Sequence, residues 1–334
     1  MRDVGSQGGG GAAGGAEAGR CGCGGRAVTY LRYSGTHRCG PCLLKSVEER
    51  ARGELRRQAD LAHGTKVAVA VSGGKDSLVA LHVVAQAAAR RRGVEVLAIT
   101  VDEGIAGYRP PSVGAAAAAA ARLGVEHRVV ALGERDRVTV DEIAALEREM
   151  APCSFCGVLR RRLANAEARR WGAHWLATGH NLDDVAQSIL LSFVRGDLGK
   201  LARLAPHDSA YEGLVPRILP LRSVPEKEVM LYALLRGMPV LAGQCPHMGR
   251  AARGSIKEML LALEDAHPGT RHTVLRAHER LQPLLREGLA PGRSPGRSPG
   301  PCPRCGEPSA GGVCQACALL DDVQAGRALR ASGL

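Results

Sequence analysis

Two short segments of the sequence combine residue types and spacings that could carry out chemistry. Residues 152–157 read PCSFCG and place two cysteines three positions apart. Such a pair can be half of a zinc site, a redox dithiol, part of an iron–sulfur cluster or two buried neighbours. Residues 72–77 read SGGKDS and bring together two glycines, one lysine and two serines. The first segment indicates thiolate chemistry, and the second indicates binding of a phosphate group.

The SGGKDS segment lies between an apolar run at residues 66–71 and a segment with helical periodicity. In such a strand-to-helix turn, backbone N–H groups converge on an anion, and the helix dipole favours the negative charge. Lys75 adds a cation, and Ser72 and Ser77 add hydroxyl donors. The spacing differs from that of the Walker motif, which has four residues between its Gly and its Gly-Lys pair. A tight glycine turn without a ligand is the structural alternative.

A second segment suited to nucleotide chemistry is ATGHNLDD at residues 177–184. It follows a predicted strand, and ligands of open α/β sheets bind at the carboxyl ends of strands. His180 and Asp184 are four positions apart at the start of a predicted helix and therefore share a face. Asp183 and Asp184 form a carboxylate pair that could bind Mg²⁺ or organise water beside a triphosphate. Capping of the helix by Asp183 is the alternative.

Eight of the eleven cysteines form one group near each end of the chain. The last group has the pattern C-x₂-C-x₈-C-x₂-C, which suits a structural zinc ion. Its members are Cys302, Cys305, Cys314 and Cys317. The first group opens with C-x-C, so His37 is an alternative to its first cysteine as a zinc ligand. Its members are Cys21, Cys23, Cys39 and Cys42.

The three remaining cysteines are Cys153, Cys156 and Cys245. Three thiolates are an odd number for a structural zinc site. Cys245 is followed by proline, as ligands of iron–sulfur clusters can be. Three cysteine ligands on a cubane cluster leave one iron open to an exogenous group. A redox pair together with an unrelated buried cysteine is the alternative.

The composition of the chain narrows its class and its partners. Lys and Arg exceed Asp and Glu by 12, which indicates a polyanionic partner such as nucleic acid, or else a well-solvated basic surface. We expect no membrane span, because no apolar run is long enough. The start of the chain lacks the apolar region of a signal peptide. We therefore expect the cysteines to bind metal or to take part in redox chemistry, and not to form disulfides.

Short apolar runs that alternate with helical segments predict the scaffold of these groups. Strands are expected at residues 66–71, 94–101, 126–132 and 174–178, and helices at 45–61, 78–92, around 115–121, from about 182, and at 267–285. This alternation predicts an α/β fold with a doubly wound parallel sheet. The expected domains are a disordered tail at 1–20, an N-terminal zinc module with a helix at 21–60, a catalytic domain at 61–285, a Gly/Pro/Ser linker at 286–301, and a C-terminal zinc knuckle with a tail at 302–334.

Six segments together carry a resemblance to a known family. In chain order they read SGGKDS, DEGIAGYR, PCSFCGVLRR, ATGHNLDD, PLRSVPEKEVMLYA and GQCPH. With the two cysteine groups, the chain resembles the tRNA 2-thiouridine synthetases of the TtcA/TtuA family, and within it the cytosolic thiouridylase (subunit 1-like) branch of archaea and eukaryotes. The resemblance covers about residues 21 to 320. It implies a fold of the PP-loop ATP pyrophosphatase (adenine nucleotide alpha hydrolase-like) type, flanked by N- and C-terminal zinc-binding modules.

The resemblance also implies a reaction. ATP would adenylate the C2 oxygen of a tRNA uridine, and sulfur would then replace that oxygen. The sulfur would be delivered on a 4Fe-4S cluster held by Cys153, Cys156 and Cys245, or as a persulfide on one of the first two without iron. Asp184 and Arg160 are expected to be catalytic together with these cysteines. The residues expected to bind ATP are Ala70, Ser72, Gly73, Gly74, Lys75, Asp76, Ser77, Arg160 and Gly179.

Cofactors, partners and location also follow from the resemblance. The expected cofactors are a 4Fe-4S cluster, two zinc ions, and ATP with Mg²⁺. The expected partners are tRNA and a ubiquitin-like, thiocarboxylated sulfur-donor protein, in the cytoplasm, with a homodimer as one oligomeric state. The choice between a T-loop uridine and the wobble uridine stays open. A non-catalytic zinc-knuckle tRNA-binding protein is the competing interpretation, and the intact Lys75, Asp76, Asp183 and Asp184 argue against it.

Overall fold

The computed structural model describes most of the chain. The described residues are 19–146, 149–207, 213–241, 243–247, 252–289, 300–309 and 311–332. The expected tail at 1–20 lies almost entirely outside them, as do residues 290–299 of the expected linker. Helix α11 spans Thr270–Gly288, so the start of that expected linker, residues 286–288, is helical.

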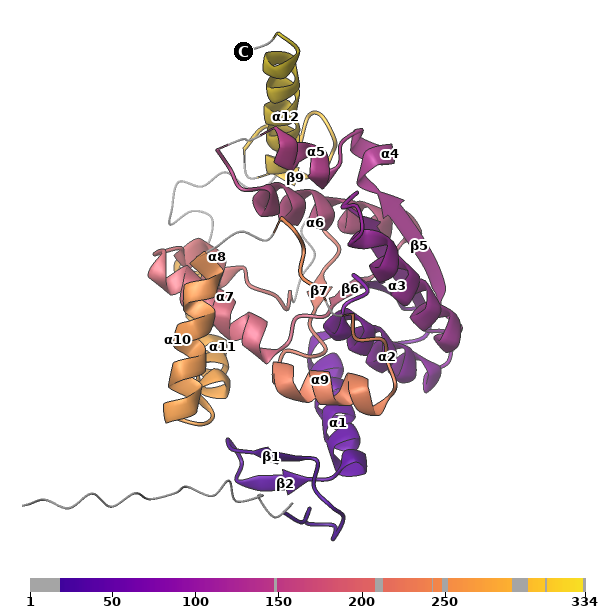
Figure 1. Ribbon diagram of the computed structural model, residues 1–334, viewed down its shortest axis with the longest axis vertical. Coiled ribbons are helices and arrows are strands. Elements are labelled where there is room, and N and C mark those ends of the chain that lie inside the picture. The colour runs from indigo at the N-terminus through magenta and orange to yellow at the C-terminus, as the bar shows by residue number, and fades with distance from the viewer. Residues whose placement is uncertain are drawn as a thin grey trace, which may run out of the picture.

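A five-stranded parallel sheet forms the centre of the molecule (Figure 1). In the order β5-β4-β3-β6-β7, its strands are Glu126–Ala131, Glu95–Asp102, Lys66–Ala70, Trp175–Thr178 and Arg217–Ile218. The chain runs outward from β3 through β4 to β5 and then returns to β6 on the other side of β3. The order therefore reverses between β3 and β6, where open α/β sheets bind their ligands. The parallel sheet and the first four strands are confirmed, whereas β7 is too short to produce a sequence pattern.

Helices cover both faces of the sheet. The longer ones are α1 (Gly40–Gln58), α2 (Lys75–Ala89), α3 (Arg109–Leu123), α6 (Pro152–Trp171), α7 (Leu182–Val194), α9 (Glu226–Leu235), α10 (Ala252–Ala266) and α11. Three short ones, α4 (Leu132–Asp136), α5 (Val140–Ala145) and α8 (Leu198–Ala202), connect them.

Alternate side chains of β3 divide the core between the two faces of the sheet. Val67 and Val69 pack with α2, α3 and α1, and Ala68 packs with Ala168 of α6 on the other face. Buried alanines of α3 let that helix lie close to the sheet. The strand therefore has no polar face, as expected for a parallel sheet that is covered on both sides.

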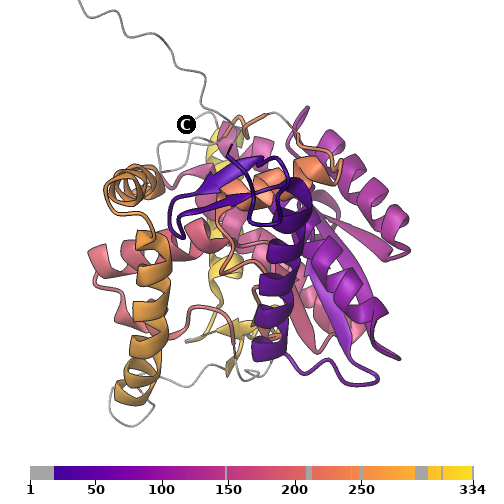
Figure 2. The same ribbon diagram turned by 90° about the horizontal axis from the view of Figure 1, so that it is seen from below.

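The two cysteine-rich modules lie at opposite ends of the molecule (Figures 1 and 2). The first contains the hairpin of β1 (Thr29–Leu31) and β2 (Thr36–Arg38) and leads directly into α1. The last contains β8 (Gly300–Pro301), β9 (Pro308–Ser309) and α12 (Gln315–Ala331), and it packs on Leu159 and Leu163 of α6. In the described part of the chain, no helix combines the length and the apolar character of a membrane span.

The turn from β3 into α2 requires glycine at one position. Gly73 has φ +85°, and a Cβ atom there would lie 2.0 Å from the backbone oxygen of Ser112 in α3. Gly74 has φ −77°, and the nearest atom to a Cβ there would be Ser72 Oγ at 3.6 Å, an ordinary contact. Position 73 therefore requires glycine because of both its backbone conformation and the lack of space, whereas position 74 does not.

We expect Gly73→Ala to lower the free energy of unfolding by about 2–4 kcal/mol, because the backbone strain adds to a clash with immovable backbone. Gly74→Ala is the matched control and should change it by less than about 1 kcal/mol. Urea unfolding of the two variants beside the wild type measures the difference. Equal stability of the two variants would contradict this description of the turn.

Candidate active site

The SGGKDS segment forms a closed loop at the carboxyl end of β3. Ser77 Oγ accepts a hydrogen bond from the Ser72 N–H at 3.0 Å and donates one to the Gly74 oxygen at 2.8 Å. The serine pair therefore holds the two ends of the loop together. The first N–H groups of α2 have no acceptor within the helix, and such a helix N-terminus favours an anion.

Lys75 is oriented by two carboxylates. Its Nζ lies 2.9 Å from Asp76 Oδ2 and 3.0 Å from Glu226 Oε1 at the start of α9. Burial opposes the charge of Lys75, but these two partners outweigh burial and raise its pKa. Asp76 also accepts a hydrogen bond from Asn181 Nδ2 at 3.0 Å. The loop, α7 and α9 thus meet around one charged lysine.

A cavity of about 340 Å³ opens beside this loop at the reversal of strand order. Of the residues predicted to bind ATP, six line it: Ala70, Ser72, Asp76, Ser77, Arg160 and Gly179. Gly73, Gly74 and Lys75 belong to the loop but do not line the cavity. A Cβ atom at Gly179 would lie 2.7 Å from the Ser77 nitrogen, so only glycine lets β6 approach the start of α2 this closely.

The two neighbouring aspartates of ATGHNLDD have different surroundings. Asp184 lines the cavity with His180 and forms a capping box with Asn181 at the start of α7. Asp183 does not line it. Its side chain is buried, accepts a hydrogen bond from the Glu226 N–H at 2.8 Å and pairs with Arg271 at 3.0 Å. Burial raises the pKa of Asp183, against these two contacts.

The predicted Mg²⁺ pair of Asp183 and Asp184 is therefore wrong for this structure. Successive helix positions differ by about 100° in direction, so adjacent carboxylates rarely face one ligand. The N-terminus of α7 is capped by Asn181 together with Asp184, and not by Asp183. Among the residues that line the cavity, the carboxylates are those of Asp76 and Asp184.

A buried carboxylate that the sequence did not single out connects the loop to α6. Glu103 is only 2% exposed, and its Oε2 lies 2.5 Å from Arg109 Nε, while its Oε1 lies 3.3 Å from Arg160 Nη1. Arg109 also donates to the Ser72 oxygen at 3.0 Å and to the Val101 oxygen. Glu103 and Arg109 lie in DEGIAGYR, a segment that contributed to the family resemblance but to no predicted site. Arg161 and Arg217 also line the cavity and were likewise not predicted as site residues.

The three cysteines outside the terminal groups meet at the start of α6. Cys153 is exposed, and its Sγ donates to the backbone oxygen of His247, two residues after Cys245. Burial raises the pKa of Cys156 to about 11; Arg160 lowers it, and Glu103, Cys245 and Cys153 raise it further. The fold therefore brings Cys245 back to the Cys-x-x-Cys pair, one helical turn before Arg160.

Three cysteines that converge on one place are a donor set that an iron–sulfur cluster could use. All three thiols are free of disulfides. Within the described residues, their sulfur atoms do not form a group with ligand atoms all within 4.8 Å of one another, as the terminal groups do. Ligands of a polynuclear cluster bind different irons and lie farther apart than the ligands of one ion. The residues present are therefore compatible with a cluster.

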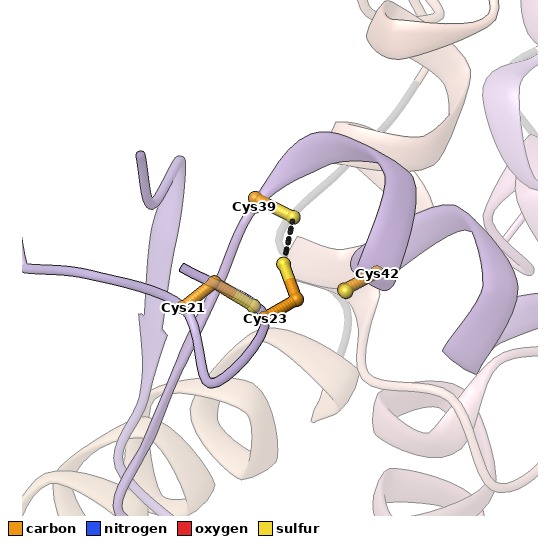
Figure 3. A group of neighbouring side chains, drawn as sticks. All are labelled: Cys21, Cys23, Cys39 and Cys42. Carbon is orange, nitrogen blue, oxygen red and sulfur yellow. Dashed lines mark hydrogen bonds between the residues drawn. The ribbon is translucent and has the colours of Figure 1, made fainter. Parts of the chain in front are cut away.

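Each terminal group brings its four cysteines together. In the first group, Cys21, Cys23, Cys39 and Cys42 offer sulfur atoms all within 4.8 Å of one another (Figure 3). His37 is not a member, because the β1–β2 hairpin stacks its ring on Tyr30 with centroids 4.7 Å apart. Cys302, Cys305, Cys314 and Cys317 form the second group on the same criterion. Four thiolates in tetrahedral reach suit zinc.

Comparison with known proteins agrees with this arrangement. The PP-loop domain family matches residues 46–242. The tRNA 2-thiolation protein NcsA of Haloferax volcanii is 40% identical over 320 residues, covering 91% of this chain and 98% of that protein. Cytoplasmic tRNA 2-thiolation protein 1 of Bos taurus is 39% identical, covering 92% of this chain and 88% of that protein.

A solved structure has the same fold over nearly the whole chain. It is described as the U34-tRNA thiolase NcsA from Methanococcus maripaludis with its 4Fe-4S cluster. It has a TM-score of 0.78 and 33% sequence identity, and the match covers 91% of this chain and 96% of that one. Similarity at this level, over about nine tenths of the chain, establishes the family. The chain belongs to the PP-loop proteins of tRNA 2-thiolation, the family that includes NcsA and cytoplasmic tRNA 2-thiolation protein 1.

Proposed function

We propose that the protein is an ATP-dependent sulfurtransferase that converts the wobble uridine of tRNA, U34, to 2-thiouridine in the cytoplasm. The names of its relatives support tRNA thiolation, a cytoplasmic location and the wobble position. One observation carries the proposal to this chain. Glu103 connects Arg109, which is bonded to the phosphate loop, with Arg160, which lies one turn from Cys156. The residues proposed to bind ATP line the cavity together with Arg160, and Cys156 lies one helical turn before Arg160 on α6.

The phosphate loop would act on ATP. The C2 oxygen of the uridine attacks the α-phosphorus, and pyrophosphate leaves. Residues 72–77 would hold the pyrophosphate through the N–H groups at the start of α2 and the charge of Lys75. Ala70 and Gly179 would leave room for the nucleotide. Arg160, with its guanidinium at the cavity, would stabilise negative charge on the adenylated uridine until AMP departs.

Asp184 is the proposed catalytic carboxylate. It lines the cavity at the N-terminus of α7. Its carboxylate would orient the base and take up the proton that is released when sulfur attacks C2. Magnesium would accompany ATP, and Asp76 and Asp184 are the carboxylates available to it among the cavity residues.

Cys153, Cys156 and Cys245 would hold the 4Fe-4S cluster by three thiolates. When bound, such a cluster supplies one iron with an open coordination position at which sulfide can be carried. The alternative route needs no iron: a persulfide on Cys153 or Cys156, supplied by a sulfane-sulfur donor, would attack C2, and the other thiol would release the transferred sulfur by forming a disulfide. The two terminal groups would each hold a structural zinc ion. A thiocarboxylated ubiquitin-like protein as sulfur donor, and a homodimer, remain predictions.

We expect protein purified without oxygen to contain about two zinc and four iron atoms per chain, with a matching amount of acid-labile sulfide. Cys245→Ser should lose most of the iron and keep the zinc. Cys23→Ser is the converse control and should lose about one zinc and keep the iron. Elemental analysis of the three proteins makes the comparison. Full thiolation activity by an iron-free protein would instead support the persulfide route.

We expect the wild type to form 2-thiouridine at position 34 of an unmodified tRNA when given ATP and sulfide, with AMP as a product. Lys75→Met should lower kcat/KM by about 10²–10³, because the leaving pyrophosphate loses its cation. Lys257→Met is the control: Lys257 contacts the same Glu226, at 3.4 Å, from α10. It should change the rate less than about threefold. Mass spectrometry of digested tRNA measures the product, and wild-type protein that leaves U34 unmodified would overturn the proposal.

A further inference from the structure

A second cavity lies between the N-terminal module and the body of the protein. Its volume is about 620 Å³, and its walls come from the β1–β2 hairpin, α1, the segment before α9, and the start of α11. Four arginines line it: Arg38, Arg50, Arg56 and Arg57. We call it the Arg38 pocket. Figure 2 shows the hairpin lying between α1 and the α10–α11 pair, and Arg32 of the hairpin is 2.7 Å from Asp265 of α10.

The positive charge of the Arg38 pocket is only half neutralised. Arg50 pairs with the buried Glu228, and Arg57 pairs with the buried Glu54. Within the described residues, Arg38 and Arg56 have no ion-pair partner. Arg38 Nε is moreover buried and without a hydrogen-bond acceptor, which is costly for a charged donor unless a ligand supplies one.

Neutral polar groups of the Arg38 pocket also fit an anion. Ser34 and Ser46 are among the lining residues. His272 lines it from α11, and its Nδ1 is buried without a hydrogen-bond partner. Its ring is held against Tyr33 with centroids 4.5 Å apart. Three residues with unsatisfied groups therefore surround one space: Arg38, Arg56 and His272.

Two hydrogen bonds connect the Arg38 pocket with the helix that carries Asp184. Arg50 donates to the Ser223 oxygen at 3.3 Å, and Ser223 lines the pocket. The next residue, Val224, accepts a hydrogen bond from the Leu182 N–H at 3.0 Å on the other side. Leu182 begins α7, which carries Asp184 into the ATP cavity. Residues 223–224 thus connect the Arg38 pocket with the start of α7, the helix that carries Asp184.

Arg56 extends the basic surface beyond this pocket. It also lines a neighbouring hollow of about 220 Å³, together with Arg52 of α1 and with Arg90 and Arg91 at the end of α2. Arg56 therefore lines both hollows, and Arg52 of the second one is paired with Glu48. A row of cations matches a ligand with repeating negative charge, such as a nucleic-acid backbone, better than a single small anion.

We propose that the Arg38 pocket binds phosphate groups of the tRNA backbone while U34 occupies the neighbouring cavity. The inference rests on the proposed function, because it takes tRNA as the substrate. It also gives the N-terminal cysteine group a structural role, which is to position Arg38. Arg38 immediately precedes Cys39, so closing the group around a metal fixes the position of the one pocket arginine that comes from the hairpin.

The test measures binding of an unmodified tRNA transcript to the full-length protein at several salt concentrations. We expect the double variant Arg38→Gln, Arg56→Gln to bind about tenfold more weakly. The slope of log K against log salt concentration should become shallower by about 1–2, since two phosphate contacts are lost. The kcat at saturating tRNA and the KM for ATP should stay within about twofold of the wild type.

Two single variants keep the test decisive. Arg56 is exposed, so Arg56→Gln alone should fold normally and still weaken tRNA binding. Arg135→Gln removes one exposed charge on α4, outside both hollows, and should leave binding unchanged. Zinc content of the Arg38 variants verifies that the cysteine group is intact.

Unaltered tRNA affinity of the double variant would overturn the proposal, as would equal weakening by Arg135→Gln. Loss of sulfur-donor protein binding with unaltered tRNA affinity would assign the pocket to a protein partner and contradict it as well. If wild-type protein binds tRNA without thiolating it, the proposed function fails, while the affinities of the variants still decide the pocket.

Discussion

The carboxylate of Glu103 is the contact on which the candidate site depends. It is buried, and it meets Arg109 on one side and Arg160 on the other. A buried charge of this kind is stable only with its partners, and removing one of them typically costs about 3–5 kcal/mol. Arg109 reaches the back of the phosphate loop, and Arg160 lies on the helix of the cysteine pair. One carboxylate thus fixes the distance between nucleotide chemistry and sulfur chemistry.

The sheet explains why these groups can meet at all. Glu103 follows β4, the phosphate loop follows β3, and Gly179 and His180 follow β6. Parallel strands present their carboxyl ends at one edge, and the reversal of order between β3 and β6 leaves a space there. The cavity lies at that edge. α6 packs on the face of the sheet opposite α2 and α3. Its N-terminus, which carries Cys153 and Cys156, lies at the same edge.

Local features were predictable from the sequence, and contacts between distant segments were not. The phosphate loop, four strands and both cysteine groups are encoded by short runs with their own periodicity or spacing. The separation of Asp183 from Asp184 depends instead on Arg271 and Glu226, which arrive from α11 and α9. The exclusion of His37 depends on the register of a hairpin that stacks it on Tyr30. The partners of Glu103 likewise become visible only once α6 is packed.

In the proposed reaction, ATP activates the C2 oxygen of the uridine, so that this oxygen leaves with AMP. The most direct measurement uses tRNA carrying ¹⁸O at C2 of U34 in a single turnover with ATP and sulfide, followed by mass spectrometry of the nucleotide products. We expect one ¹⁸O atom in AMP for each 2-thiouridine formed and none in pyrophosphate. Formation of 2-thiouridine with unlabelled AMP, or with the label in another product, would contradict it.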